Sequence, residues 1–324
     1  MSRNTAFSVL CSLALLSGAA AAEDRFITFD YPGATSTTSW GVNAEGVVVG
    51  SYVDSSGSTH GFLLREGKFT SVDYPGAVYT SAQGINTQGD IVGCHIEDAT
   101  RIPNSIGCHG FLLHQGAFIS VDAPGKYGTM AVRINDAGQI VGCVHDDTGP
   151  GGTMSNDGLH AVRYSNGAFT QLSMGMTMDY SLTADGSVTT GIVMMDGVTH
   201  GYLSRGDTVV PFDFPFAALT NPLDMTPSGD TIVGGYIDRA NATHGFLLRL
   251  GDSSGAFGGL TGPFEFITID YPGATRTVAR GINPRGDVVG NYVDAAGKTH
   301  GFFLSAVGAV IVGGPPSSSP NQSQ

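Results

Sequence analysis

Charged residues are scarce in this sequence: Asp, Glu, Lys and Arg make up only 13% of its 324 residues. Long stretches with apolar residues at helical spacing are absent, which disfavours a helical fold. Basic residues are especially few, with 15 Lys and Arg against 28 Asp and Glu, a formal net charge of −13. A chain this acidic is a poor partner for nucleic acid or anionic lipid, so we expect neither as a partner.

Two common site motifs are also absent. The sequence has no His-Glu-x-x-His metal motif and no complete phosphate-binding loop ending in Gly-Lys-Ser/Thr. These absences remove the usual sequence evidence for a zinc protease or a nucleotide-binding protein. We therefore expect no resident metal or cofactor, and whether the chain is an enzyme stays open.

The two ends of the chain differ from the rest. Arg3, an apolar run over residues 6–16 and the small residues 20–22 are typical of a cleaved secretory signal, here residues 1–22. The apolar run is short for a membrane span of ~20 residues. Residues 313–324 contain no apolar residue and are expected to form a disordered tail. We therefore predict a secreted protein, extracellular or periplasmic, with one domain over residues 23–312 and no membrane insertion.

Glycine is abundant, with 48 residues, and a ten-residue pattern recurs. The clearest copies, residues 84–93 and 281–290, read Gly-Ile-Asn-x-x-Gly-Asp-Ile/Val-Val-Gly. Six copies define units 1 to 6 in chain order, and their third positions are 43, 49, 48, 43 and 57 residues apart. This third position, called the marker below, is occupied by Asn43, Asn86, Asn135, Thr183, Thr226 and Asn283.

Unit 1 illustrates the structure expected for each copy. Residues 41–43, 47–53, 60–64 and 68–73 are predicted strands, separated by turns rich in Gly, Ser and Asp. The following Tyr74-Pro75-Gly76-Ala77 leaves the sheet, because proline cannot donate to a central ladder. Four strands at a period of about 40–50 residues are typical of propeller blades. We predict an all-β protein, a six-bladed β-propeller of four-stranded antiparallel blades.

Two segments compete to complete the last blade. The Tyr-Pro-Gly-Ala segment that connects the fourth strand of one unit to the next unit is called the crossing below. Residues 26–34 are an extra copy of the fourth strand and its crossing, placed before unit 1. Residues 309–312 occupy the position of the last unit's own fourth strand. We expect the N-terminal segment to close the ring.

The third strand of each unit begins with a histidine in a pattern such as His60-Gly61-Phe62 or His244-Gly245-Phe246. Together with the Gly-Ile/Val-Asn pattern, it resembles the HAF repeat of bacterial extracellular proteins. That family usually has His-Ala-Phe, where this chain mostly has His-Gly-Phe. The resemblance covers nearly all of the mature chain and implies export and repeat architecture, but no activity. We interpret the six histidines as structural, each hydrogen-bonded within its own unit, because specialised sites break a repeat's symmetry.

The residues at the inner strands are the candidate ligand site. Glycine is expected where six strands crowd an axis, but units 3 and 5 have Arg133 and Asp224 instead. An aromatic platform with a few polar clamps is what a sugar or small acid needs. The alternative is that these side chains plug the channel and pair with one another. The predicted ligand-binding set is Trp40, Gln83, Arg133, Tyr180, Asp224 and Arg280.

Acidic residues recur in the loops before the histidines, and in most cases we expect them to cap the loop backbone. Calcium held jointly by several loops is the alternative, although no single loop has an EF-hand-like spacing. These residues are Asp54, Glu97, Asp146, Asp238 and Asp294.

Cysteine is rare, and Cys11 lies in the predicted signal. In an exported chain we expect oxidation, with Cys94 and Cys108 as the first choice of disulfide across their connecting loop. Cys94 with Cys143 is the rival pairing. A metal site with His95 and His145 is disfavoured, because alternation puts Cys94 and His95 on opposite faces of the strand.

These observations predict a secreted, monomeric propeller that binds an extracellular glycan or small molecule at its loop face. The expected mouth is the face with the Tyr-Pro-Gly-Ala crossings and the acidic loops. One alternative is a propeller-type enzyme, a polysaccharide lyase or hydrolase, with Tyr180, Arg133 and Asp224 as candidate catalytic residues. Another is a structural or interaction scaffold.

Overall fold

The computed structural model describes residues 25–98, 100, 107–146, 158–171, 177–206, 208–250 and 265–306. The predicted signal, the predicted tail and the rival closing strand at 309–312 lie outside these residues. Every helix or strand assigned in the described part of the chain is a β-strand. The prediction of an all-β protein is confirmed.

Each unit supplies strands in the expected order, but the inner strand is longer than predicted and begins about five residues earlier. Units 1 to 3 contain β2 (Ser36–Val42), β3 (Val48–Val53), β4 (Thr59–Arg65), β5 (Lys68–Val72), β6 (Tyr79–Ile85), β7 (Ile91–Ile96), β8 (His109–His114), β9 (Ala117–Ser120), β10 (Gly128–Ile134), β11 (Ile140–His145), β12 (Leu159–Ser165) and β13 (Ala168–Gln171). Units 4 to 6 contain β14 (Thr177–Leu182), β15 (Thr189–Met195), β16 (Val198–Arg205), β17 (Thr208–Phe212), β18 (Leu219–Met225), β19 (Thr231–Ile237), β20 (Thr243–Arg249), β21 (Glu265–Ile269), β22 (Arg276–Ile282), β23 (Val288–Val293) and β24 (Thr299–Leu304).

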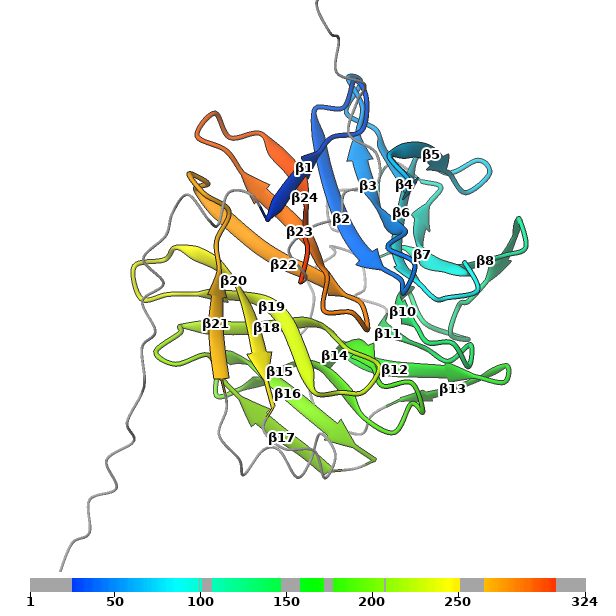
Figure 1. Ribbon diagram of the computed structural model, residues 1–324. Coiled ribbons are helices and arrows are strands. Elements are labelled where there is room, and N and C mark those ends of the chain that lie inside the picture. The colour runs from blue at the N-terminus through cyan, green and yellow to red at the C-terminus, as the bar shows by residue number, and fades with distance from the viewer. Residues whose placement is uncertain are drawn as a thin grey trace, which may run out of the picture.

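The units follow one another in chain order around a common centre, which confirms the propeller (Figure 1). Four sheets are separate and have four strands each. Units 1 and 2 instead share one eight-stranded sheet, because Thr59 of β4 and Tyr79 of β6 form a parallel bridge. The expected six separate blades are therefore reduced to four, with the first two repeats joined at a single residue pair.

The N-terminal segment closes the ring. β1 (Phe26–Phe29) pairs antiparallel with β24, with Phe26 opposite Leu304 and Phe29 opposite Gly301. The last sheet has the order β1-β24-β23-β22, and Figure 1 shows β1 beside β24. The preference for residues 26–34 as the closing strand is confirmed. The first and last parts of the described chain are thereby held in one sheet.

The markers close turns and join neighbouring units. Asn43 Oδ1 accepts the N–H groups of Glu45 and Val47 at 3.1 and 3.0 Å, which fixes the turn after the inner strand. Its Nδ2 donates to the carbonyl of Asn86 in the next unit at 3.1 Å. Asn283 of unit 6 donates to Asn43 at 3.2 Å, so this linkage also spans the closure.

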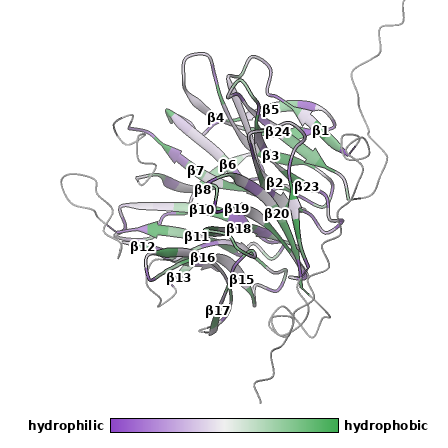
Figure 2. Cartoon of the chain, turned by 90° about the vertical axis from the view of Figure 1, so that its left-hand side faces the viewer, coloured by the Kyte–Doolittle hydropathy of each residue, from purple (hydrophilic) through white to green (hydrophobic). Residues whose placement is uncertain are grey.

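At the opposite end of the inner strands, the crossing aromatics stack on the next unit. The rings of Tyr31 and Tyr52 lie 3.5 Å apart and nearly parallel, and Tyr271 and Tyr292 repeat this at 3.6 Å. Apolar segments lie in strands throughout the stacked sheets (Figure 2). The apolar cores between sheets and these stacks give a rigid frame.

The repeated histidines are bonded within their units, as the structural interpretation requires. His60 Nδ1 lies 3.0 Å from Asp73 Oδ1, and His200 Nδ1 lies 2.8 Å from Asp213 Oδ2. The same bond closes unit 6 through β1, where His300 Nδ1 lies 2.9 Å from Asp30 Oδ2.

Three of the five predicted loop acids, Asp54, Asp238 and Asp294, cap their loops. Asp54 Oδ1 accepts the N–H groups of Ser56 and Ser58 at 2.8 and 2.9 Å. Hydrogen bonds from Ser56 and Ser58 lower the pKa of Asp54 to about 2. Asp238 and Asp294 cap their loops in the same way. Within the described ranges no three His, Cys, Asp or Glu side chains are grouped as metal ligands. Calcium held by several loops stays the untested alternative.

Candidate functional site

A β-bulge at one position of every inner strand builds the centre of the molecule. In β2 the pairing register shifts between Ser39 and Gly41, which leaves Trp40 as the extra residue. The other five inner strands shift at the equivalent position. A bulge bends its strand and re-aims side chains. The predicted ligand-binding residues lie at or directly after these bulges, so the structure does bring them around one axis.

Arg133 fills the axis and is held from several sides. Its Nε lies 3.1 Å from Asp224 Oδ1, and both side chains are about nine-tenths or more buried. The Nη1 group donates to the carbonyls of Trp40 and Gln83 at 3.3 and 2.9 Å. The Nη2 group donates to the carbonyls of Leu223 and Arg280 at 3.2 and 3.1 Å. The four terminal N–H groups of the guanidinium are thus used within the protein, while the buried Nε faces Asp224 as an ion pair without a hydrogen bond.

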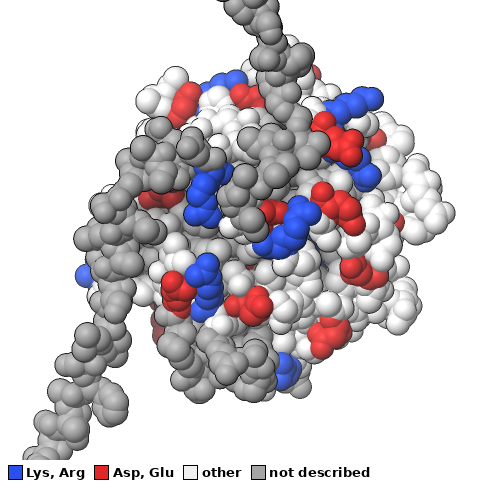
Figure 3. Space-filling view, in the orientation of Figure 1, with Lys and Arg blue, Asp and Glu red and all other residues white. Residues whose placement is uncertain are grey.

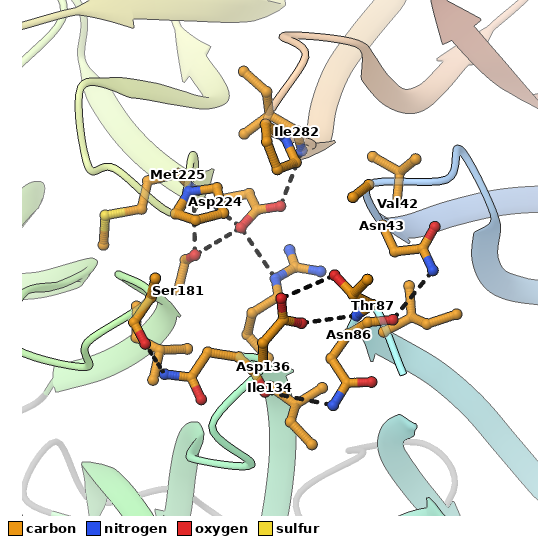
Figure 4. Close-up of a pocket in the computed structure, with 18 residues that line it drawn as sticks. Val42, Asn43, Asn86, Thr87, Ile134, Asp136, Ser181, Asp224, Met225 and Ile282 are labelled. Carbon is orange, nitrogen blue, oxygen red and sulfur yellow. Dashed lines mark hydrogen bonds and ion pairs between the residues drawn. The ribbon is translucent and has the colours of Figure 1, made fainter. Parts of the chain in front are cut away.

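Asp224 is equally engaged. Its Oδ1 accepts the Ser181 hydroxyl at 2.6 Å, and its Oδ2 accepts the Ile282 N–H at 2.9 Å. Figure 4 shows Asp224 facing both residues. Burial raises the pKa of Asp224, and the Arg133 guanidinium opposes that rise. The pair therefore acts as a plug that contacts all six units.

Glycine at the same position in neighbouring units makes room for this plug. A Cβ on Gly41 would lie 2.7 Å from Arg133 Nη1, and one on Gly84 would lie 2.9 Å from Arg133 Cα. Contacts this short force the neighbour to move. The sequence departure at Arg133 and the glycines beside it are thus parts of one packing arrangement.

The other members of the predicted set are directed to partners in the protein. The Arg280 guanidinium lies 4.0 Å above the Trp40 ring, and its Nε donates to Asn291 Oδ1 at 2.5 Å. Burial, and then Arg276, lowers the pKa of Arg280 to about 10. Gln83 Nε2 lies 3.7 Å from Cys94 Sγ, and burial raises the pKa of Tyr180. The contacts match the plug alternative, and ligand binding by this set stays a prediction.

A small cavity lies over the plug at the marker end of the inner strands. It has a volume of about 90 Å³, with Arg133, Ser181 and Asp224 among its lining residues. Its rim includes Asp136, whose carboxylate accepts the N–H and hydroxyl of Thr87 at 2.8 and 2.9 Å. Pockets for drug-sized ligands have volumes of ~300–1,000 Å³. This cavity suits a few waters rather than a sugar ring.

The cavity does not open where the mouth was expected. Each inner strand runs from the crossing to the marker turn, so the marker turns lie at the end opposite the Tyr-Pro-Gly-Ala crossings. The sequence reasoning placed the mouth at the crossings and the acidic loops, which share one face of the propeller when the Gly-Ile-Asn strand is innermost. The marker of unit 1, Asn43, was predicted as the last residue of the strand over 41–43 and not as part of a site.

A larger cavity, called the unit 1–2 groove below, lies between the outer strands of units 1 and 2. Its volume is about 610 Å³. It is lined by Leu63, Thr70, Ser71, Val72, Asp73, Gln88, Gly89, Asp90, Ile91, Leu113, His114, Gln115, Gly116 and Phe118. Sequence reasoning missed it. The signal that could have found it is His114, which lies outside the six repeated histidine positions.

The predicted disulfide between Cys94 and Cys108 is wrong, and the rival Cys94–Cys143 pair does not form either. All three thiols are free and buried. In the β7–β8 ladder Cys94 lies directly opposite Gly110, so Cys108 is only a diagonal neighbour. A hydrogen bond with Cys94, and then burial, raises the pKa of Cys108.

Asp179 beside the axis provides a pH-dependent prediction. Burial raises its pKa from 3.8 to about 6, although the Tyr202 hydroxyl donates to it. The folded protein thus holds this proton more tightly than the unfolded chain. The resulting destabilisation is complete above pH 6 and disappears as the pH falls toward 4.

Asp179→Asn keeps an acceptor for Tyr202 and carries no charge. We expect the variant to be more stable than the parent by about 2–3 kcal/mol at pH 8, from ~1.4 kcal/mol per pKa unit. The stability difference between variant and parent should shrink by pH 4 to the part that does not depend on the charge of Asp179. Urea unfolding of both proteins from pH 4 to 8 measures this, and a stability difference that does not change with pH would contradict it.

No family model matches the sequence, and no curated protein matches it. Similar solved structures include TolB from Acinetobacter baumannii, with 11% identity and a TM-score of 0.43 over 84% of this chain and 54% of that one. This chain thus spans about half the length of that protein.

Two further solved structures are similar over most of both chains. The β-propeller domain of the Trilobed protease from Pyrococcus furiosus has 9% identity and a TM-score of 0.47, with 84% of this chain and 96% of that one covered. Aleuria aurantia lectin has 13% identity and a TM-score of 0.44, with 88% and 98% covered. At these scores the propeller assignment rests on the strand pairing of this chain. Among the described residues, no helix is long and apolar enough to cross a bilayer.

Proposed function

We propose that this chain is an exported six-unit β-propeller that binds an extracellular ligand, a glycan or another small molecule, without converting it. The observation that carries this proposal is the contrast between its two cavities. The axial cavity of about 90 Å³ lies over the buried Arg133–Asp224 pair, while the unit 1–2 groove of about 610 Å³ has the size of a ligand site. Binding is therefore assigned to the groove and not to the axis.

The contacts of the candidate catalytic residues favour binding over catalysis. A general acid or base must reach the proton that it transfers, and Asp224 is held by Arg133, Ser181 and backbone N–H groups. The terminal nitrogens of Arg133 donate to four carbonyls, and its Nε is buried against Asp224, which places the guanidinium out of reach of a developing charge on a ligand. These residues are better explained as structural.

The surface charge agrees with a soluble binding module. Acidic and basic side chains are interspersed on the uncovered part of the face in Figure 3, and the described residues seen there form no large basic area. The signal-like residues 1–22 and the resemblance to extracellular repeat proteins support export.

The test is a binding and turnover assay on the purified chain from residue 23. A glycan array and calorimetry should detect saturable binding of at least one carbohydrate. Incubation with a polysaccharide panel should release no reducing ends and no unsaturated products. Product release would replace the binding role by the lyase or hydrolase alternative, and no binding on any array would leave the scaffold role.

A further inference from the structure

We propose that the unit 1–2 groove binds a pyranose ring that carries no carboxylate or sulfate, and that His114 helps to select it. This inference rests on the proposed function, because it names the ligand class and the residues of the same site. Four observations support it: the groove has an apolar floor, its walls carry hydrogen-bonding groups, its charge is negative, and unit 2 has a His–Asp pair where the other units do not.

The floor of the groove is apolar and fixed in position. Leu63, Ile91, Leu113 and Phe118 contribute to it. Phe118 packs edge-on against Tyr74 and Phe111, with ring centroids 5.0 and 5.2 Å apart. Such a floor suits the C–H face of a sugar ring, which needs an apolar surface that is already in place.

Both walls of the groove carry hydrogen-bonding groups held in place by neighbours. On the unit 1 wall, Ser71 Oγ donates to Asp73 Oδ2 at 2.6 Å, and Asp73 Oδ1 lies 3.0 Å from His60 Nδ1. On the unit 2 wall, Asp90 Oδ1 lies 2.6 Å from His114 Nδ1. Carboxylates and hydroxyls positioned in advance can bind sugar hydroxyls without a large ordering cost.

The charge of the groove selects against acidic ligands. Its lining contains the carboxylates of Asp73 and Asp90 and the imidazole of His114, but no Lys or Arg. The whole chain has a formal charge of −13, which adds a field of the same sign. A uronic acid or sulfated sugar would enter against this charge, whereas a neutral hexose or amino sugar would not.

Unit 2 is the only unit with a His–Asp pair at this position. The position of His114 is occupied elsewhere by Arg65, Ser165, Arg205, Arg249 and Ser305. In unit 6 the equivalent contact is between Ser305 Oγ and Asp287 Oδ1 at 3.5 Å. The fold therefore tolerates serine beside the aspartate, and the histidine of unit 2 is an additional feature. His114 is also accessible, with 45% of its side chain exposed.

The test uses two variants of the purified chain. His114→Ser gives unit 2 the Ser–Asp contact of unit 6, and Thr70→Trp fills the groove from an exposed position on β5. The probes are methyl glycosides of glucose, galactose, mannose, fucose and N-acetylglucosamine, with methyl glucuronoside as the acidic comparison. Ligand-observed NMR and calorimetry measure binding.

We expect at least one neutral glycoside to bind the parent chain, with affinity lowered at least tenfold by each variant and melting temperatures within about 3 °C of the parent. Matched controls are Arg65→Ser, at the His114 position of unit 1, and Ile119→Trp, at the exposed position of β9 that corresponds to Thr70. Both should bind normally, because neither residue lines the groove.

The outcomes separate this inference from the proposed function. Undiminished glycoside binding by both variants would overturn the groove assignment while leaving the proposed function intact. Tighter binding of the glucuronoside than of any neutral glycoside would overturn the ligand class. Absence of binding by the parent chain, both to these probes and on the glycan array, would overturn the proposed function itself.

Discussion

Replacing Arg133 by methionine is expected to lower the free energy of unfolding by about 3–5 kcal/mol, the usual cost of removing one partner of a buried ion pair. The change leaves Asp224 buried without its counter-charge, and it removes the donors to four carbonyls around the axis. At roughly 2–4 °C per kcal/mol for a chain of this size, the melting temperature should fall by about 10 °C. Thermal unfolding followed by circular dichroism measures this loss.

The ion pair can be isolated with a double-mutant cycle. Asp224→Asn alone should also destabilise the chain, and Arg133→Met with Asp224→Asn should cost less than the two single changes added together. Arg65→Met is a surface control and should change stability by no more than about 0.5 kcal/mol. If Arg133→Met instead abolished ligand binding at an unchanged melting temperature, the plug interpretation would be wrong and the axial site would become the ligand site.

Removing residues 23–31 is the second change with a large expected effect. It deletes β1, uncovers the edge of β24 and removes Phe26, whose ring lies 5.3 Å from that of the fully buried Phe302. It also removes Tyr31, which stacks on Tyr52. With ~1.5–3 kcal/mol for each large apolar side chain, a loss of about 5 kcal/mol or more is expected. Calorimetry should show a lower and broader transition, and a newly exposed strand edge should promote aggregation.

A circular permutant provides the matched control for this deletion. Residues 25–35 are placed after Ser305 through a Glu-Gly turn, as Glu66-Gly67 connects β4 to β5 in unit 1. The closing strand then follows β24 in the order used by the other units, and the melting temperature should recover most of the loss. A deletion variant that melts like the parent would show that β1 contributes little to closing the ring.

Much of the fold could be predicted because the repeat carries its own local rules. The marker Asn43 caps its turn through two backbone N–H groups, and Gly46 has the positive φ of 82° that the turn requires. Such contacts depend on neighbours within about five residues, so the sequence pattern reports them directly. The extra copy at 26–34 likewise predicted the closure, because it repeats the pattern of the fourth strand and stands before unit 1.

The candidate site was predictable only in part. Arg133 and Asp224 stood out because they replaced glycine at repeated positions, and the structure does place them together at 3.1 Å. Whether they bind each other or a ligand depended on which carbonyls surround the guanidinium.

The disulfide between Cys94 and Cys108 was predicted from the loop between them, but the ladder places Cys94 opposite Gly110. The bridge between Thr59 and Tyr79 also depended on how two neighbouring units meet.

Local sequence patterns specified the all-β repeat architecture, the strand order within each unit and the N-terminal closing strand. These features follow from turn chemistry and alternation, which act over a few residues. Only the tertiary structure decided that the axis is plugged, that the thiols are free and that the ligand-sized groove lies between units 1 and 2. Those outcomes depend on side chains from units tens to hundreds of residues apart, whose contacts are set by the packing of whole sheets against one another.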